Sequence, residues 1–422
     1  VRVSVTDFIA GGLEPDEGVE IAALLESAGA DYISVSNGQY ESGHTTIEPA
    51  SFDDGWRVYL AEMVKAKVSV PVVTGGVIRN PAMADQIIRE NKADYVFVGR
   101  NMIADPEWML KVRQGRPEDI RPCLSCNTCI GRSMQSLHMI CAVNPQAGRE
   151  TMLKGMHRTR QPKNVLVVGG GPAGMAAARI LASKGHKVTL AEREATLGGM
   201  LESAAKPPHK QRVGMLQEYL IRELQKTSAD IKTGVSVDQS FIQDLKPDVL
   251  IAATGSTPIP INGLPDNGAV IQAIDVLNLD QPFTGEKVLV VGGGTTGCET
   301  ALYLADHGNQ VTLIEAAGQL AIGMENMSRL TLMQDIKKAG IKRMTKTSFK
   351  GFANHRAELL GPDGPVALDV DRIVLALGFR PNIAVIDSLG KIVPEVYVIG
   401  DAEKPRTIEA ALYEAEITAR QI

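Results

Sequence analysis

The sequence predicts an α/β fold with three parts in order: the C-terminal half of a (β/α)8 barrel, a four-cysteine segment, and two Rossmann-like dinucleotide-binding domains. Three observations predict it. Four strand–helix units fill residues 1–121, four cysteines follow in close succession, and a glycine-rich fingerprint occurs twice in the remainder. Alternating strands and helices build parallel sheets, and a repeated fingerprint indicates a duplicated domain.

The half-barrel is predicted from four apolar runs that lack strict alternation, as expected of strands buried on both faces. The runs are Val1–Val5, Tyr32–Ser36, Pro71–Gly75 and Tyr95–Gly99. Helical patterns separate them over 16–28, 56–67 and 81–90. Strand–helix alternation of this kind indicates parallel βαβ units.

Two loops in this part could hold a phosphate. Thr74–Arg79 follows the third run and contains Gly75-Gly76, and Gly99-Arg100 follows the fourth. In a full barrel these loops would follow strands seven and eight, where phosphate sites are common. Glycine amides and an arginine fork suit a phosphate monoester. The alternative is that the glycines simply end strands.

The cysteine segment has the spacing C-x2-C-x2-C-x11-C, over Cys123, Cys126, Cys129 and Cys141. Four thiolates are the usual ligands of an iron–sulfur cluster. A structural zinc site usually pairs two separated C-x2-C knuckles, and a disulfide framework needs an oxidising compartment. The spacing therefore favours a 4Fe–4S cluster, with zinc and disulfides as alternatives. The fifth cysteine, Cys298, lies in an apolar helix start and is expected to be a buried small residue.

The duplicated fingerprint is G-x-G-x-x-G after a four-residue apolar strand, at Gly169–Gly174 and at Gly292–Gly297. Each copy leads to a second strand that ends in an acid, Glu192 or Glu315, 23 residues after the first glycine. The first glycine allows the tight turn, the second admits the pyrophosphate, and the third lets helix pack on strand. The acid accepts hydrogen bonds from the ribose hydroxyls. Glycines used only for packing are the alternative.

Glu315 also predicts which nicotinamide nucleotide the second site prefers. A carboxylate repels a 2′-phosphate, and no arginine follows in Ala316-Ala317-Gly318. The second site should therefore prefer NAD(H) over NADP(H).

Three further strand ends carry small or acidic residues: Thr254-Gly255, Gly378 and Gly400-Asp401. A strand that ends in Gly-Asp can bring a carboxylate and a helix N-terminus to a flavin ribityl and pyrophosphate. Gly-Asp is also a common loop, so this interpretation depends on the two fingerprints beside it.

These features resemble the two-dinucleotide flavin reductases, which hold one FAD fold and one NAD(P) fold. The order half-barrel, four cysteines, FAD fold, NAD fold is similar to the iron–sulfur flavoenzymes of the old yellow enzyme superfamily. That family includes 2,4-dienoyl-CoA reductase, enoate reductase and trimethylamine dehydrogenase. The most specific match is Arg121-Pro-Cys-Leu-Ser-Cys-Asn127, preceded by Gly99-Arg100.

The resemblance implies FMN, FAD, NAD(H) and a 4Fe–4S cluster as cofactors. The expected domains are an FMN-binding barrel half over 1–121, a cluster segment and linker over 122–160, an FAD-binding domain over 161–284 and 376–422, and an NAD(H)-binding domain over 285–375. The residues expected at FMN are Arg2, Gly76, Arg79, Gly99 and Arg100. Those expected at the two dinucleotides are Gly169, Gly171, Pro172, Ala173, Gly174, Glu192, Arg193, Gly199, Thr254, Gly255, Gly292, Gly294, Gly297, Glu315, Gly378, Gly400 and Asp401.

Two departures from the family pattern stand out. Many members have a basic residue directly after the glycine of the third loop, where this chain has Val77. Family members also have about half a barrel more before the point that corresponds to Val1. We therefore expect this chain to be the C-terminal part of a longer enzyme, with the substrate-side acid residues before residue 1.

The expected function is NADH-dependent reduction of an activated C=C bond in an unsaturated acid or thioester. An amine dehydrogenase that passes electrons to an external flavoprotein is the alternative, and a truncated product with only an NADH–FAD module is a third possibility. The net charge of −5 and pI near 5.9 give no basic face for nucleic acid. No apolar run reaches 18 residues, so nothing suits a membrane span. The cysteine cluster and the lack of a signal peptide together favour a reducing cytoplasm, and a homo-oligomer is possible.

Overall fold

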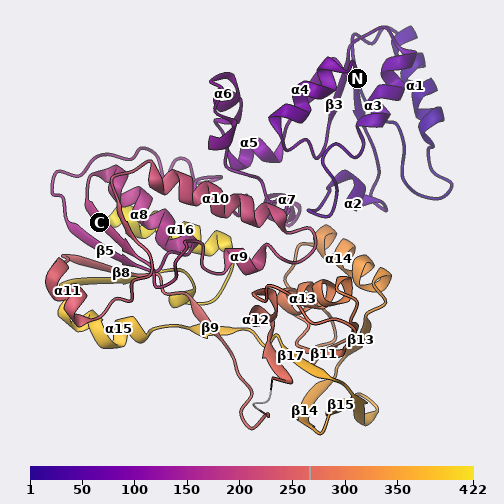
Figure 1. The fold of residues 1–422 in the computed structure, drawn as a ribbon. Helices are drawn as coiled ribbons and strands as arrows, with labels where there is room; N and C mark the ends of the chain where they lie inside the picture. The colour runs from indigo at the N-terminus through magenta and orange to yellow at the C-terminus, as the bar shows by residue number, and fades with distance from the viewer. Residues whose placement is uncertain (266–267) are drawn as a thin grey trace. The chain divides into compact units, whose positions relative to one another are not determined.

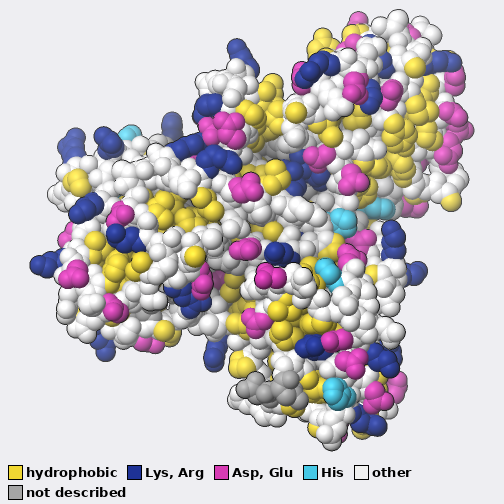
Figure 2. All heavy atoms as spheres, in the orientation of Figure 1, with side chains coloured by type: hydrophobic (Ala, Val, Ile, Leu, Met, Phe, Trp, Pro, Cys, Tyr) yellow, Lys and Arg dark blue, Asp and Glu magenta, His cyan; other side chains and the backbone are white. Residues whose placement is uncertain are grey.

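The computed structural model describes residues 1–265 and 268–422, which fall into two compact units. The first unit comprises residues 1–148 with 325–331, and the second comprises residues 149–324 with 332–422. Figure 1 labels their helices and strands. Acidic and basic side chains are interspersed over the face drawn in Figure 2. None of the helices described has both the length and the hydropathy needed to cross a membrane.

The first unit is built on a four-stranded parallel sheet in the order β1-β2-β3-β4. Its strands are Arg2–Ser4, Ile33–Ser36, Val72–Gly75 and Tyr95–Phe97. The connecting helices are α1 (Pro15–Ser27), α3 (Val58–Lys67) and α4 (Pro81–Arg89). Asn80 caps α4 through its side chain, and Pro81 occupies the first turn, where no backbone donor is needed. The four predicted strand–helix units are confirmed, with boundaries within two residues of expectation.

The two faces of this sheet differ. Val35, Ile33 and Val72 point toward the helices and are buried with Leu60 and Val64 of α3. Alternate residues point the other way and line a hollow of about 650 Å³. Its lining includes Arg2, Ser34, Val73, Tyr95 and Phe97. The expectation of strands buried on both faces is therefore wrong for the described residues, because one face of β1–β4 is open.

Short helices complete the first unit. They are α2 (Gly43–Thr46), α5 (Arg100–Ala104), α6 (Trp108–Arg113), the 3-10 turn η1 (Pro117–Asp119) and α7 (Thr128–Met134). Helix α5 begins directly after Gly99, and α7 begins inside the cysteine run.

The second unit contains two five-stranded parallel sheets of the same design, in the orders β19-β8-β5-β6-β7 and β10-β17-β11-β12-β13. The first sheet uses Glu395–Val398, Val249–Ala252, Asn164–Val168, Lys187–Ala191 and Asp230–Lys232. The second uses Val270–Gln272, Arg372–Leu375, Lys287–Val291, Gln310–Glu315 and Lys342–Thr345. Val165 pairs with Val188 and Val288 pairs with Val311, so the two copies share one register. The predicted duplication is confirmed.

Helices α8 (Pro172–Lys184) and α13 (Thr295–Asp306) follow the first strand of each copy. Helix α16 (Ile408–Gln421) packs against α8. The other elements are α9 (Leu201–Ala204), α10 (Gln211–Gln225), α11 (Gln239–Leu245), β9 (Ser256–Pro258), α12 (Ala273–Leu277), α14 (Asn326–Lys338), β14 (Ser348–Ala353), β15 (Arg356–Gly361), β16 (Gly364–Asp369), β18 (Phe379–Pro381), α15 (Ala384–Leu389), η2 (Gly390–Ile392) and η3 (Gly400–Ala402).

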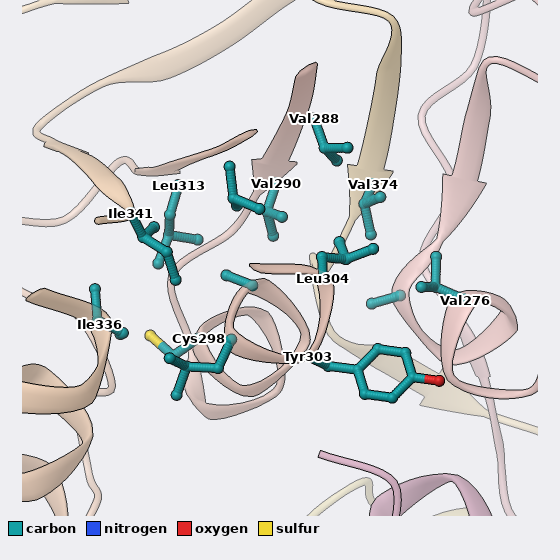
Figure 3. Packing of buried hydrophobic residues seen from close by; sticks show 14 of the residues in the cluster. Val276, Val288, Val290, Cys298, Tyr303, Leu304, Leu313, Ile336, Ile341 and Val374 are labelled. Carbon is teal, nitrogen blue, oxygen red and sulfur yellow. The ribbon is translucent and has the colours of Figure 1, made fainter. Parts of the chain in front are cut away.

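The core of the second copy is shown in Figure 3, where aliphatic side chains of the sheet meet one face of α13. Cys298 is fully buried in this core, and its thiol donates to the Gly293 carbonyl oxygen at 3.4 Å. Its predicted role as a buried small residue is confirmed.

Candidate functional site

The first glycine of each fingerprint is required by the backbone. Gly169 and Gly292 have φ of +110° and +108°, which disfavour any L side chain. A Cβ at Gly169 would lie 2.3 Å from the Ala253 carbonyl oxygen, and one at Gly292 would lie 2.4 Å from that of Ala376. Each loop therefore turns tightly against a neighbouring strand of its sheet.

The second and third glycines of each fingerprint differ in the space around them. A Cβ at Gly174 or Gly297 would lie within 2 Å of the carbonyl oxygen of the first glycine, at 1.9 and 1.8 Å. A Cβ at Gly171 or Gly294 would have no atom within 4 Å. The third glycine thus packs helix on loop, and the second leaves open space at the helix N-terminus. That space is where a pyrophosphate would approach.

The two acids make the same contacts in both copies. Glu192 accepts from the Gly170 amide at 2.6 Å and from the Glu194 amide at 2.9 Å. Glu315 accepts from the Gly293 and Ala317 amides, both at 2.7 Å. Each carboxylate is therefore held at the end of its strand, against its own glycine-rich loop.

A cavity of about 660 Å³ lies over the second copy. It brings together four predicted residues, Gly292, Gly294, Glu315 and Gly378. Its lining also includes residues that the sequence analysis missed: Pro258, Ile261, Gln272, Thr347, Ser348 and Phe349. These side chains belong to no motif, and only the fold brings them to the loop.

The first copy gathers its predicted residues around the start of α8. A Cβ at Gly199 would lie 3.1 Å from the Cα of Gly171, and one at Gly400 would lie 2.9 Å from the Cβ of Ala173. Asp401, beside Gly400, accepts from the Ser256 hydroxyl at 3.3 Å. The Gly400-Asp401 turn therefore lies next to the glycine-rich loop.

Three other predicted residues of this copy have local roles. The Thr254 hydroxyl donates to the Asn382 carbonyl oxygen at 2.6 Å, and Gly255 has φ of +70°. Arg193 is exposed and pairs with Glu194 at 3.1 Å. Its side chain is thus engaged at the surface.

The four cysteines of the run influence one another electrostatically. Cys129 and Cys141 are buried, and Cys123 and Cys126 are half-buried. Burial, with a smaller contribution from the other three cysteines, raises the pKa of the Cys129 thiol to about 12. Burial likewise raises the pKa of Cys141 to about 11. Thiols in such a place become thiolates when a metal supplies positive charge, so the donor set suits an iron–sulfur cluster.

The backbone of this run turns sharply on either side of Cys126, because Ser125 and Asn127 have φ of +51° and +57°. No group of three or more Cys, His, Asp or Glu in the described ranges is close enough to hold a single metal ion. A four-iron cluster spreads its ligands more widely than one ion does, so that finding concerns single-ion sites.

The predicted phosphate loops of the first unit are held by ion pairs. Arg79 pairs with Asp54 at 2.5 Å and donates to the Ser125 hydroxyl at 2.8 Å. Arg100 donates to the Asn127 side-chain oxygen and pairs with Glu48 at 3.1 Å. These contacts engage both guanidinium groups with the protein itself.

Arg2 lies with its guanidinium 5.1 Å from the centre of the Phe97 ring and donates to the Ser36 hydroxyl at 3.3 Å. The sequence analysis missed Arg57 and Glu48, which lie beside these loops. Both are buried, and no motif marks either one.

Comparison with known proteins identifies the parts of the chain. Residues 1–119 match the NADH:flavin oxidoreductase / NADH oxidase family, and residues 163–415 match the pyridine nucleotide-disulphide oxidoreductase family. The chain is 43% identical to an NADH oxidase of Thermoanaerobacter brockii over 95% of its own length and 63% of the relative's. It is 32% identical to a cinnamate reductase of Clostridium sporogenes over 100% of its own length and 65% of the relative's.

A solved complex of 2-naphthoyl-CoA reductase with 2-naphthoyl-CoA has the same fold. Its TM-score is 0.94 at 30% identity, with 100% of this chain and 64% of that chain covered. This chain thus spans somewhat less than two thirds of the length of these relatives. The two matched families bind FMN, FAD and NAD. The chain belongs to the old yellow enzyme-type iron–sulfur flavoenzymes, with an FMN-binding barrel-type domain followed by a pyridine nucleotide-disulphide oxidoreductase module.

Proposed function

We propose that this chain serves an NADH-dependent reductase of an activated C=C bond in an enoate or enoyl-CoA thioester. Bound FAD and FMN would supply two-electron chemistry and a 4Fe–4S cluster single-electron transfer between them. NADH would become NAD⁺, and the C=C bond would gain a hydride equivalent at the β-carbon and a proton at the α-carbon. The observation that carries the proposal is the complete second glycine-rich site, because a reductase that takes electrons from NADH needs it. We propose a small-molecule substrate and a cytoplasmic location with it.

The second site would bind NAD(H) through the fingerprint and its acid. The open space at Gly294 admits a pyrophosphate, and the N-terminus of α13 faces it. Glu315 would accept from the adenosine ribose hydroxyls, because each carboxylate oxygen can accept more than one hydrogen bond. A 2′-phosphate would meet the same carboxylate and be repelled.

The first site would bind FAD in the same way, with Gly171 open to the pyrophosphate and Glu192 at the ribose. Asp401 would accept from the ribityl chain, since Gly400 adjoins the start of α8. We assign this FAD domain to 161–284 and 376–422, and the NAD(H) domain to 285–375.

The cluster would be held by Cys123, Cys126, Cys129 and Cys141, in a segment that we assign to 122–160. The buried thiols Cys129 and Cys141 would be shielded from water, which protects a cluster. The proposal is supported by the mutual electrostatic influence of the four cysteines.

The first 121 residues would be half of an FMN-binding barrel, and the open face of β1–β4 would belong to its interior. Gly76, Gly99 and Arg100 would bind the phosphate, and Arg2 would lie at the flavin ring. Arg79 and Arg100 each keep an ion pair, with Asp54 and Glu48, that would hold the guanidinium groups in place beside the phosphate.

The test is anaerobic reduction of the full-length protein. Addition of NADH should bleach the flavin absorbance, and a subsequent enoate or enoyl-CoA should restore it. The amine dehydrogenase alternative predicts bleaching by a methylated amine and none by NADH. Failure of NADH to bleach the flavin would exclude the proposed reductase.

A further inference from the structure

The Gly75-Gly76 turn at the end of β3 is packed from both sides. A Cβ at Gly75 would lie 2.3 Å from the Phe97 ring, and one at Gly76 would lie 2.1 Å from Nε and Nη2 of Arg57. Gly76 also has φ of +91°. The guanidinium of Arg57 therefore occupies the space that a side chain at position 76 would fill.

The Arg57 side chain is buried, with 6% of the residue exposed, and its hydrogen bond and its ion pair are both made by the Nε atom. It donates to the Gly75 carbonyl oxygen at 2.9 Å and lies 3.3 Å from a carboxylate oxygen of Glu48. Within the described residues, the two terminal nitrogens of Arg57 have no hydrogen-bond partner. These terminal nitrogens are not fully enclosed, so they can still donate to an anionic group that approaches Gly76.

The charge around this turn is unbalanced. Burial lowers the pKa of Arg57, Glu48 opposes this effect, and the positive charges of Arg2 and Arg100 lower the pKa further. Among the residues that the structure describes, the carboxylate paired with both Arg57 and Arg100 is Glu48, which is 2% exposed. Three guanidinium groups and one carboxylate leave an excess positive charge of about two at neutral pH.

We propose that Arg57 is a phosphate-binding residue of the FMN site and that it makes the site select phosphorylated flavin. The unused fork of Arg57 lies beside Gly76, where it can donate to two oxygens of a phosphate monoester. A dianionic phosphate would also neutralise the excess charge of the three arginines. This inference rests on the proposed binding of FMN at Gly76 and Arg100.

A purely structural role for Arg57 makes a different prediction. Through Gly75, the side chain could simply support the turn, and its loss would then weaken binding of every flavin equally. A phosphate ligand would affect FMN and leave riboflavin, which has no phosphate, unchanged. The ratio of the two dissociation constants therefore separates the two roles.

The experiment uses the full-length protein, stripped of flavin and refilled with FAD. Wild type, Arg57→Gln, Arg57→Lys and the control Arg116→Gln are titrated with FMN and with riboflavin. Arg116 is an ion-paired arginine of the same unit, joined to Asp119. Arg57→Gln should raise the dissociation constant of FMN about 10-fold or more, because a charge-assisted hydrogen bond is lost. The dissociation constant of riboflavin should stay within about 2-fold of wild type. Arg57→Lys should lie between Arg57→Gln and wild type, and Arg116→Gln should match wild type.

If the ratio of the FMN and riboflavin dissociation constants stays at its wild-type value in both Arg57 variants, the inference is overturned. If Arg57→Gln does not fold, Arg57→Lys alone must still shift the ratio. Wild type that binds no FMN would refute the proposed FMN site itself. Wild type that binds FMN, with no change in ratio in the variants, would refute only the role of Arg57.

Discussion

The carboxylate of Glu315 accepts a hydrogen bond from the backbone amide of Gly293 at 2.7 Å. Glu192 holds Gly170 in the same way at 2.6 Å. In both copies the protein's own backbone amides thus hold the acid against its glycine-rich loop. Restricting the side chain in this way reduces the entropy lost on binding, and each carboxylate oxygen keeps a lone pair, which our assignment gives to a ribose hydroxyl.

The first prediction concerns nucleotide preference. Wild type should prefer NADH over NADPH by about 10-fold or more, which corresponds to about 1.4 kcal/mol, because Glu315 repels a 2′-phosphate. Glu315→Arg should reverse the order, and Glu315→Gln should reduce the preference while it keeps an acceptor for the Gly293 amide. Steady-state kinetics with both nucleotides measure this. The matched control is Glu192→Gln in the other copy, which should leave the preference unchanged, and equal affinities in wild type would contradict the assignment.

The second prediction concerns the cluster. Cys126→Ser should remove the broad iron–sulfur absorbance and release iron, because one of four ligands is lost. The matched control is Cys298→Ser, whose hydroxyl can still donate to the Gly293 carbonyl oxygen and which should keep its iron. Iron analysis and absorbance spectra decide it. Unchanged iron in Cys126→Ser would count against a cluster at this run.

The third prediction separates two glycines of one loop. Gly297→Ala should destabilise the protein by about 1–3 kcal/mol, because its Cβ would meet a carbonyl oxygen at 1.8 Å. Gly294→Ala should fold normally, since its φ is −63° and no atom lies within 4 Å of the added Cβ. It should nevertheless weaken NADH binding, because the methyl group enters the space for the pyrophosphate. Urea denaturation and NADH titration measure the two effects, and similar behaviour of the two variants would be inconsistent with this geometry.

The fourth prediction concerns residues 1–422 expressed alone. The second unit contains both glycine-rich loops, so this chain should retain FAD and oxidise NADH with an artificial dye acceptor. It should bind FMN poorly and reduce no enoate, because the face of β1–β4 that would hold the flavin is open, with Tyr95 60% exposed. Extraction and chromatography of the bound flavins test this. Stoichiometric FMN in the purified chain would contradict this prediction, because it would show that residues 1–422 form a complete FMN site.

The sequence predicted features that are local or that belong to a motif of fixed spacing. Gly169 and Gly174 meet within one tight turn, and Glu192 was expected from its spacing in the fingerprint. Arg57 was not predicted because no motif marks it, although its hydrogen bond to Gly75 spans only 18 positions. The prediction that the strands of the first unit are buried on both faces was wrong, because the elements that cover a sheet can be distant from it in sequence.

Arg79 and Arg193 illustrate what a motif leaves undetermined, and their cofactor roles stay predictions. Both follow a motif closely enough to be assigned to a cofactor. The structure pairs them with Asp54 and Glu194. A motif gives the residue type and its place along the chain, but the charge that a side chain meets depends on the three-dimensional packing around it.

In the proposed function, a cluster at the four cysteines carries electrons between the NADH–FAD module and the FMN site. Anaerobic stopped-flow reduction by NADH tests it most directly, with wild type, Cys126→Ser and Cys298→Ser in the full-length protein that contains both flavins. NADH should reduce both flavins in wild type and in Cys298→Ser, but only one of the two in Cys126→Ser. Reduction of both flavins at the wild-type rate in Cys126→Ser, after loss of its iron, would contradict it.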